Sequence, residues 1–190
     1  MYIKRLLKAL TLIIIFSLLW TSQANAAEIT GLQDSCAAAL VKLDIMHKDA
    51  KGNLKLNDKI KRYEFIATVN SAMSYDQADT KDVEMSFKDI TSKHKAYNDI
   101  KAAVGHDLLD AYSDNTIRPD KIITYAEALD IVIRALGYGK TISNDEPEKT
   151  LKKAVELGLT NNPELPASSQ ISRGEAAIII YNALTVDFNN

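Results

Sequence analysis

The stretch "IRPDKIITYAEALDIVIRAL", residues 117–136, decides the fold because shorter versions of it occur twice more in the chain. These are "DKIKRYEFIATVNSAM", residues 58–73, and "SQISRGEAAIIIYNAL", residues 169–184. In each, an isoleucine is followed by a residue at the helix-cap position, and a glutamate stands three residues after that cap position. Apolar residues then recur at every third or fourth position. That spacing predicts three amphipathic helices of about three to four turns each.

Two of these helices begin with a residue pair that favours a helix start. The pairs are Thr124 with Glu127 and Ser172 with Glu175. Each pair predicts a capping box, in which the hydroxyl accepts a hydrogen bond from the third amide of the helix and the carboxylate accepts one from the cap amide. Lys61 holds the cap position before Glu64 and has no acceptor, so we expect that helix to use Asp58 or to start without a full cap.

A second short helix is predicted before each of these helices, at residues 37–45, 96–108 and 151–159. Loops rich in Gly, Asn, Asp, Pro and Ser join the two helices of each pair. Helices this short are marginally stable alone, so their apolar faces must be buried against one another. We therefore predict an all-α fold with three helix–loop–helix repeats in a pseudo-threefold arrangement around a central three-helix bundle.

The three repeats are expected at about residues 29–73, 84–138 and 147–186. The glutamates at the helix starts are 63 and 48 positions apart, so the first interval carries an insertion, which we place in the polar segment 74–83. Together the repeats fill a single domain, residues 27–190.

The first 26 residues have the layout of a secretory signal peptide. Lys4, Arg5 and Lys8 precede an apolar stretch at residues 9–20, and a small-x-small pattern ends at Ala26. These twelve apolar residues are too few for a membrane anchor, because a helix that spans a bilayer needs about 20. We expect cleavage after Ala26, export of the mature chain, and no later insertion into a lipid bilayer.

The mature chain would be acidic, because removal of residues 1–26 leaves 20 basic residues against 25 acidic ones, a formal net charge of −5. This balance offers no electrostatic footprint for nucleic acid or for anionic lipid. Cys36 is the only cysteine, which excludes an internal disulfide. We expect it to be a small buried side chain, with pairing between two chains as the alternative.

The sequence contains no pattern that predicts a metal site or a catalytic group. The histidines His47, His94 and His106 are scattered without a ligand spacing, and the loop "HKDAKGNLKLND" places His47 and Lys51 where a calcium loop needs acidic ligands. No nucleophile has an evident activating partner. Spacing alone does not exclude two carboxylates for sugar hydrolysis, but three repeats leave no room for a catalytic domain. We expect no enzyme activity, no cofactor and no metal.

The segment "SFKDITSKHKAYNDIKAAVGHDLLDAYSDNTIRPDKIITYAEALDIVIRAL", residues 86–136, resembles an S-layer homology motif over nearly its whole length. The Phe-x-Asp opening (Phe87, Asp89), the "AYNDI" helix, the "YSDNTIRPD" loop and the helix start come in the order of that family. The first and third repeats lack this opening, but their "IKRYE" and "ISRGE" starts and their spacing fit. The resemblance implies a protein of the bacterial cell wall or cell surface.

The resemblance also implies a ligand and its contacts. In the family, the grooves between motifs hold secondary cell-wall polysaccharides, often with a pyruvate ketal, and an arginine in the first turn of the helix is the recurrent contact. That position is Arg62 in the first repeat and Arg173 in the third, whereas the middle repeat has Tyr125. A helix N-terminus favours an anion, and an arginine there adds a planar fork for a carboxylate. Glu64 and Glu175 would orient these arginines or cap their helices.

We therefore expect a protein that anchors without a covalent bond to an anionic wall polysaccharide, with Arg62, Arg173 and Tyr125 as contacts. The alternative is a member of the family that has lost the sugar site and uses the same fold as a scaffold to bind another surface protein. The sequence leaves both open, because first-turn arginines are also common as solvated surface residues.

Overall fold

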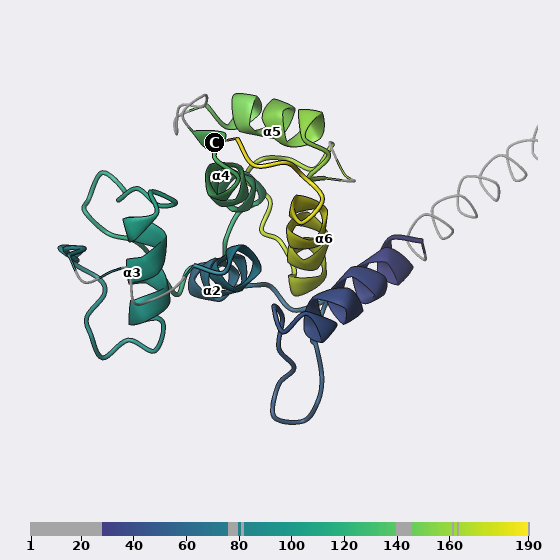
Figure 1. Cartoon of the computed structure of the whole chain (residues 1–190), viewed down its shortest axis with the longest axis horizontal. Helices are drawn as coiled ribbons and strands as arrows, with labels where there is room; N and C mark the ends of the chain where they lie inside the picture. Colours follow the sequence, from purple (N-terminus) through teal and green to yellow (C-terminus); the bar gives the residue numbers. More distant parts are fainter. Residues whose placement is uncertain are drawn as a thin grey trace, which may run out of the picture.

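The computed structural model describes residues 28–75, 80, 82–139, 146–160, 162 and 164–189. Its helices are α2 (Arg62–Met73), α3 (Tyr97–Gly105), α4 (Tyr125–Ala135), α5 (Pro147–Glu156) and α6 (Arg173–Ala183), preceded by a helix that runs to residue 42 from residue 28, where the description begins (Figure 1). The described residues form isolated β-bridges but no strand, so the predicted all-α class is confirmed. The predicted signal peptide lies outside the described residues, as do residues 76–79 and 81 of the predicted insertion.

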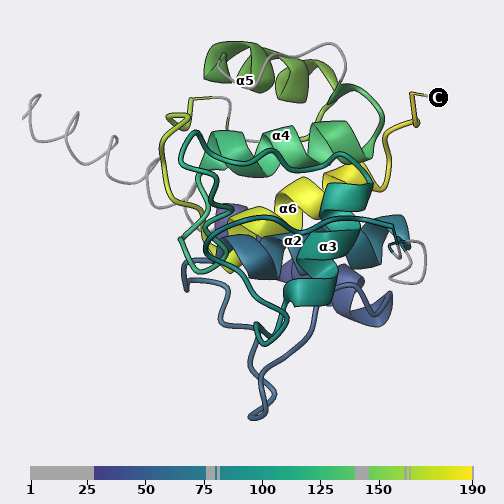
Figure 2. The ribbon, with the colours of Figure 1, turned by 90° about the vertical axis from the view of Figure 1, so that its left-hand side faces the viewer.

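The three capped helices α2, α4 and α6 pack against one another in the middle of the molecule (Figures 1 and 2). The helix α3 packs on α2, and α5 packs on α4. The N-terminal helix (residues 28–42) reaches the start of α6, where the Gln33 side chain lies so close to Gly174 that a β-carbon there would come within 2.6 Å of it. Each capped helix is therefore in contact with one further helix, which is α3 for α2, α5 for α4 and the N-terminal helix for α6.

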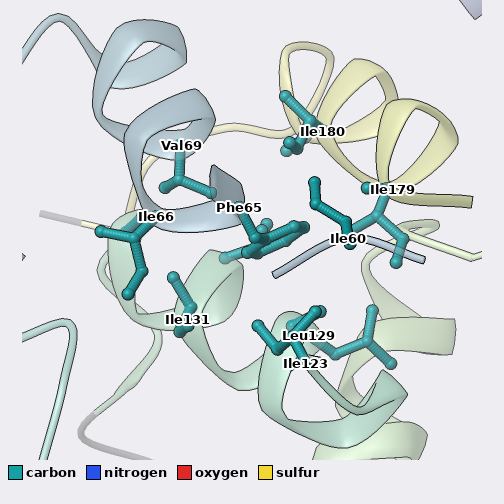
Figure 3. Packing of buried hydrophobic residues seen from close by; sticks show 14 of the residues in the cluster. Ile60, Phe65, Ile66, Val69, Ile123, Leu129, Ile131, Ile179 and Ile180 are labelled. Atoms are coloured by element: carbon teal, nitrogen blue, oxygen red, sulfur yellow. The ribbon is translucent and has the colours of Figure 1, made fainter. Parts of the chain in front are cut away.

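Phe65 lies at the centre of the core, surrounded by isoleucine and leucine side chains from all three capped helices (Figure 3). The isoleucine that precedes each cap is also inside, with Ile60, Ile123 and Ile171 all 0% exposed. Burying one such side chain stabilises a fold by about 1.5–3 kcal/mol, which explains why the apolar positions of the three capped helices set the packing.

The helix α6 differs from the predicted single apolar stripe. Its five consecutive apolar residues, Ala176 to Ile180, are all buried, so most of its circumference is covered. A helix that is apolar all round belongs inside a protein. The sequence shows this only as a longer apolar run, and the pairing of that run with α2, α4 and the N-terminal helix is a tertiary effect.

The short helices before the capped ones end earlier than predicted. Residues 42, 105 and 156 are their last helical positions, and the chain then turns through Asp44, Asp107 or Gly158 in the left-handed conformation, with φ of 60°, 56° and 70°. A left-handed residue stops a helix because it breaks the run of helical dihedrals. The apolar residue that follows each one is buried, which explains why the apolar pattern extends beyond the helix.

Candidate functional site

The backbone just before the three capped helices forms a closed ring of hydrogen bonds. The Ile60 amide donates to the Ile171 carbonyl at 3.2 Å, and the Ile171 amide donates to the Ile123 carbonyl at 3.3 Å. The Ile123 amide closes the ring by donating to the Ile60 carbonyl at 3.1 Å. The three helix starts are thereby held around one point, although more than 100 residues separate the first from the last.

The first two amides of each capped helix donate to carbonyls of another unit's loop, at 2.8 to 3.0 Å. The donor and acceptor pairs are Arg62 with Lys121 and Tyr63 with Pro119 for α2, Tyr125 with Ser169 and Ala126 with Ala167 for α4, and Arg173 with Asp58 and Gly174 with Leu56 for α6. The expectation that these amides attract a ligand carboxylate is therefore wrong, because carbonyl groups of the chain itself use them.

These contacts define three junctions. The Arg62 junction is the start of α2 against residues 109–122, the Tyr125 junction is the start of α4 against residues 160, 162 and 164–170, and the Arg173 junction is the start of α6 against residues 46–59. In each, the named side chain also bonds to a carbonyl of the opposing loop, and these acceptors are Ile117, Asn162 and Leu54. The structure thus gives the three predicted contact residues equivalent positions at three separate places.

The glutamates of the helix starts act as caps. The Glu127 carboxylate accepts from the Thr124 amide at 2.9 Å, and the Thr124 hydroxyl accepts from the Glu127 amide at 3.4 Å. In α6 the corresponding bonds join Ser172 and Glu175, at 2.6 and 3.1 Å. The helix α2 has only the returning half of the box, from the Lys61 amide to the Glu64 carboxylate at 3.2 Å, because a lysine side chain has no acceptor.

The Arg173 junction contains an open, basic groove. Its volume is about 450 Å³, and five basic side chains (Lys48, Lys55, Lys59, Lys61 and Arg173) line it against three carboxylates (Asp49, Asp58 and Glu64). The whole chain has a formal net charge of −2, so this groove is positive against an acidic background. A concave site with an excess of one sign of charge attracts ions of the opposite sign.

The guanidinium of Arg173 is held in place at the wall of this groove. Its Nε donates to the Leu54 carbonyl at 2.9 Å and one terminal nitrogen donates to the His47 carbonyl at 3.2 Å. The side chain is only partly buried. A guanidinium has five N–H donors, so two bonds to carbonyls orient its plane and leave donors for a ligand.

The loop that supplies the lysines is itself well ordered by local bonds. The Asp49 carboxylate accepts from the amides of Lys51 and Asn53, both at 2.9 Å, and forms an ion pair with Lys55 at 3.4 Å. The Asn53 amide is the main cause of a lowered pKa for Asp49, with the Lys51 amide and Lys55 adding to it. Because the loop carries its own bracing, the backbone that bears its lysines is held in one conformation beside the groove.

The Arg62 junction is closed and densely charged. Arg62 is 6% exposed, and its Nε donates to the Ile117 carbonyl at 3.1 Å. The Tyr112 ring centre lies 5.5 Å from its guanidinium carbon, and the Tyr112 hydroxyl donates to Glu127. Burial alone would raise the pKa of Glu127, but the Tyr112 hydroxyl, the Thr124 amide and the charge of Arg62 together lower it to about 2.

The Tyr125 junction contains a small, largely apolar pocket. Tyr125 is 2% exposed, and its hydroxyl bonds to the Thr160 hydroxyl and to the Asn162 carbonyl, the latter at 3.0 Å. The pocket has a volume of about 180 Å³, and none of its lining side chains is basic, whereas Glu175 is acidic. Its apolar lining consists mainly of Ile29, Leu32, Leu165, Ile178 and Ile179. This pocket does not offer a charge to an anion.

Sequence reasoning missed the lysines of the Arg173 groove and the role of Tyr112. A signal for the lysines was present, since residues 47–62 hold six basic residues and two acidic ones. It also left Asp89 of the Phe-x-Asp opening without a role. The two oxygens of Asp89 accept from the amides of Ile117 and Arg118 at 2.8 and 2.7 Å, which braces the loop opposite Arg62.

The described residues contain neither a cluster of metal-binding side chains nor a membrane-spanning helix. Within residues 28–75, 80, 82–139, 146–160, 162 and 164–189, no three side chains of His, Cys, Asp or Glu gather where they could hold a metal ion. In the same part of the chain, no helix has the length and apolar character needed to cross a membrane. Cys36, in the N-terminal helix, is a free thiol that is 2% exposed.

Comparison with known proteins gives one family and several relatives. The family model described as "S-layer homology domain" matches residues 86–129. A "Cell surface protein" of Thermoanaerobacter kivui is 30% identical over 183 residues, which cover 93% of this chain and 24% of that protein. A "Middle cell wall protein" of Brevibacillus brevis is 28% identical over 137 residues, with coverages of 72% and 13%. A "Surface layer protein" of Brevibacillus choshinensis is 26% identical over 153 residues, with coverages of 75% and 14%. The chain spans a quarter or less of the length of these relatives.

Proposed function

The chain carries an S-layer homology domain, and from this premise we propose that it attaches without a covalent bond to an anionic polysaccharide of a bacterial cell wall. The names of the relatives, which refer to a cell surface, a cell wall and a surface layer, support this location. The proposed role is attachment, which requires a binding site and no catalytic group.

We propose further that residues 27–190 are one domain of three repeats, exported by a signal peptide that is removed after Ala26. The ring of backbone hydrogen bonds supports three repeats, because one isoleucine from each takes the same position in it. The three isolated β-bridges support it in the same way, since each joins the segments before two different capped helices.

The observation that carries the proposal is the basic groove at the Arg173 junction. Five cations and three carboxylates line it, so it favours a negatively charged sugar in a chain that is acidic overall. A carboxylate such as that of a pyruvate ketal fits the free donors of Arg173, because carboxylate and guanidinium are both planar and form two parallel hydrogen bonds. A second hollow of about 510 Å³ shares Lys48, Asn53, Leu54 and Lys55 with the groove, which leaves room for the next sugars of a polymer.

Of the three residues expected to contact the glycan, Arg173 is the one we propose for that role. Arg62 and Tyr125 are 6% and 2% exposed and bond to carbonyls of the opposing loops. We propose that they mainly join neighbouring repeats. Lys48 and Lys59, both exposed at the rim of the Arg173 groove, would add charge to the site.

Binding to isolated walls tests the function. The protein should sediment with native Brevibacillus brevis walls and should stay in solution when the wall polysaccharide has been stripped. Retention on stripped walls would support the alternative, a scaffold that binds another surface protein, for which the apolar pocket at the Tyr125 junction is the supporting observation.

Substitution of Arg173 tests the site. Arg173→Ala should weaken wall binding about ten- to hundredfold, because a hydrogen bond to a charged group contributes about 1.5–3 kcal/mol. Lys152→Ala is the matched control, since it removes one exposed positive charge from α5, away from the groove. Equal binding by the two variants would remove Arg173 from the site.

A further inference from the structure

The loops of the first and second repeats have the same conformation at a constant offset of 63 residues. Three pairs of residues with positive φ are 63 positions apart, namely Asp44 and Asp107, Gly52 and Asn115, and Lys55 and Arg118. The hydrogen bonds agree, because the Asp49 amide donates to the Asn53 carbonyl as the Tyr112 amide donates to that of Thr116, both at 2.9 Å. Asp49 and Tyr112 therefore hold the same position in two copies of one loop.

The arginines that face these two loops are also equivalent. The Nε of Arg173 donates to Leu54 and the Nε of Arg62 donates to Ile117, and these acceptors are again 63 positions apart. Each junction also has a helix-start glutamate in the corresponding place, which is Glu64 in the groove of Arg173 and Glu127 beside Arg62. The two junctions thus share their arginine, their carboxylate and the backbone of the loop.

The main difference between the Arg62 and Arg173 junctions is the residue at the equivalent loop position, which is Tyr112 in the first and Asp49 in the second. Asp49 is short, and its carboxylate bonds back to its own loop, so the space in front of Arg173 is open. Tyr112 instead places a ring against three cations, with its centre 3.9 Å from the guanidinium carbon of Arg118, 5.5 Å from that of Arg62 and 5.6 Å from the ammonium of Lys121. Cations over an aromatic face attract its electrons, so each of these contacts holds the ring in place.

The hydroxyl of Tyr112 fixes the ring at its other end. It donates to Glu127, which also accepts from Lys121 at 3.1 Å and lies 4.0 Å from a terminal nitrogen of Arg62. Burial, together with this bond to a carboxylate, raises the pKa of Tyr112 to about 12, so the hydroxyl stays protonated and keeps donating at neutral pH. A sugar carboxylate that approached Arg62 would have to displace both the ring and this bond.

We propose that Tyr112 closes the Arg62 junction to anionic sugars, so that the Arg173 groove is the site that binds, and that removing the ring creates a second site. This inference rests on the proposed function. The opened junction would bring Arg62, Arg118 and Lys121 against Glu127 and Asp114, a positive balance like that of the Arg173 groove. Tyr112 is then the residue that sets how many sugars one chain binds.

Stoichiometry is the measurable consequence. Isothermal titration with a synthetic hexosamine that carries a 4,6-pyruvate ketal should give one site per chain for the unchanged protein and two for Tyr112→Ser. Tyr112→Phe is the matched control, since it keeps the ring and should give one site. In the Tyr112→Ser background, Arg62→Ala and Arg173→Ala should each remove one of the two sites, which assigns the gained site to Arg62.

The outcomes separate this inference from the proposed function. Two sites in the unchanged protein would refute the proposal that Tyr112 closes the Arg62 junction. A single site in Tyr112→Ser that Arg173→Ala abolishes would refute it as well. Either result leaves Arg173 as the proposed binding site. If the unchanged protein binds none of this sugar and is retained on stripped walls, the proposed function itself is overturned. Should Tyr112→Ser not fold, guanidinium NMR signals of the unchanged protein decide. Addition of the sugar should shift the signal of Arg173 and leave that of Arg62 in place, and a shift of both would refute closure.

Discussion

Replacing Glu127 with glutamine should remove the carboxylate that holds the Arg62 junction together. This carboxylate accepts hydrogen bonds from the Tyr112 hydroxyl, the Lys121 ammonium and the Thr124 amide, and it lies 4.0 Å from Arg62. Its side chain is 21% exposed, so water screens these interactions only in part. Glutamine has nearly the same shape but no charge, which makes the substitution a test of electrostatics rather than of packing.

The expected loss follows from the pKa of Glu127. The folded protein lowers it from 4.5 to about 2, and a tenfold change in proton affinity corresponds to 1.36 kcal/mol, so the charged carboxylate stabilises the fold by about 3 kcal/mol. Because the folded pKa is the lower one, this contribution is complete above about pH 4.5 and disappears as the pH falls toward 2. Glu127→Gln should therefore be about 3 kcal/mol less stable at pH 7 and only about 1 kcal/mol less stable at pH 3.

Urea unfolding of both proteins at a series of pH values measures this difference, provided that the dependence on urea concentration is the same for the two. Glu84→Gln is the matched control, because the same chemical change at an exposed position outside the helices should leave the stability curve as it is. A difference that stays constant from pH 7 to pH 3, or that is below about 1 kcal/mol at pH 7, would refute the reasoning, since both outcomes mean that the charge of Glu127 contributes little.

Four further outcomes are expected. Arg62→Ala should lower the free energy of unfolding by about 1–3 kcal/mol, because it removes the buried bond from Nε to the Ile117 carbonyl and a positive charge 4.0 Å from Glu127, which keeps Lys121 as its other cation. Sugar binding in titration should stay at one site, and a loss of binding in a folded variant would count against this. Phe65→Ala should cost about 3–5 kcal/mol in urea unfolding, since it empties the centre of the core, and a cost below about 1 kcal/mol would contradict the packing. Ser172→Ala should cost about 1 kcal/mol through loss of the α6 cap, measured by thermal melting, whereas no change would mean that water replaces the hydroxyl. Affinity for the pyruvylated sugar should fall as sodium chloride rises from 0.1 to 1 M, because the screening length shortens from about 10 to about 3 Å; an affinity independent of salt would exclude a charge-driven site.

The helix starts could be predicted because capping is a local interaction. Thr124 and Glu127 are three residues apart, so the bonds between them require nothing from the rest of the chain. The ends of the short helices were predicted less accurately, since Asp44 and Asp107 take a left-handed conformation that is more typical of glycine. The turns at these two residues depend on the burial of the apolar residue that follows each of them.

The candidate groove could be predicted only in part. Arg173 was identified by its position in the repeat, but the groove around it is formed with the loop at residues 46–59, more than 110 residues earlier in the chain. The lysines of that loop were not predicted as part of a site, because nothing in the local pattern places them opposite Arg173. The prediction that the first amides of these helices are free was wrong for the same reason, since the carbonyls that accept from them belong to distant loops of the chain.

By itself the sequence determined the all-α class, the starts of the three capped helices and the resemblance to a family, because periodicity, capping and motif order are carried by residues near one another. Only the tertiary structure distinguished Arg62 from Arg173. Both occupy the first turn of equivalent helices, and their exposure depends on whether the opposing loop brings Tyr112 or Asp49 against them. Burial is a property of contacts between distant segments, so no reading of either helix start alone could have separated the two arginines.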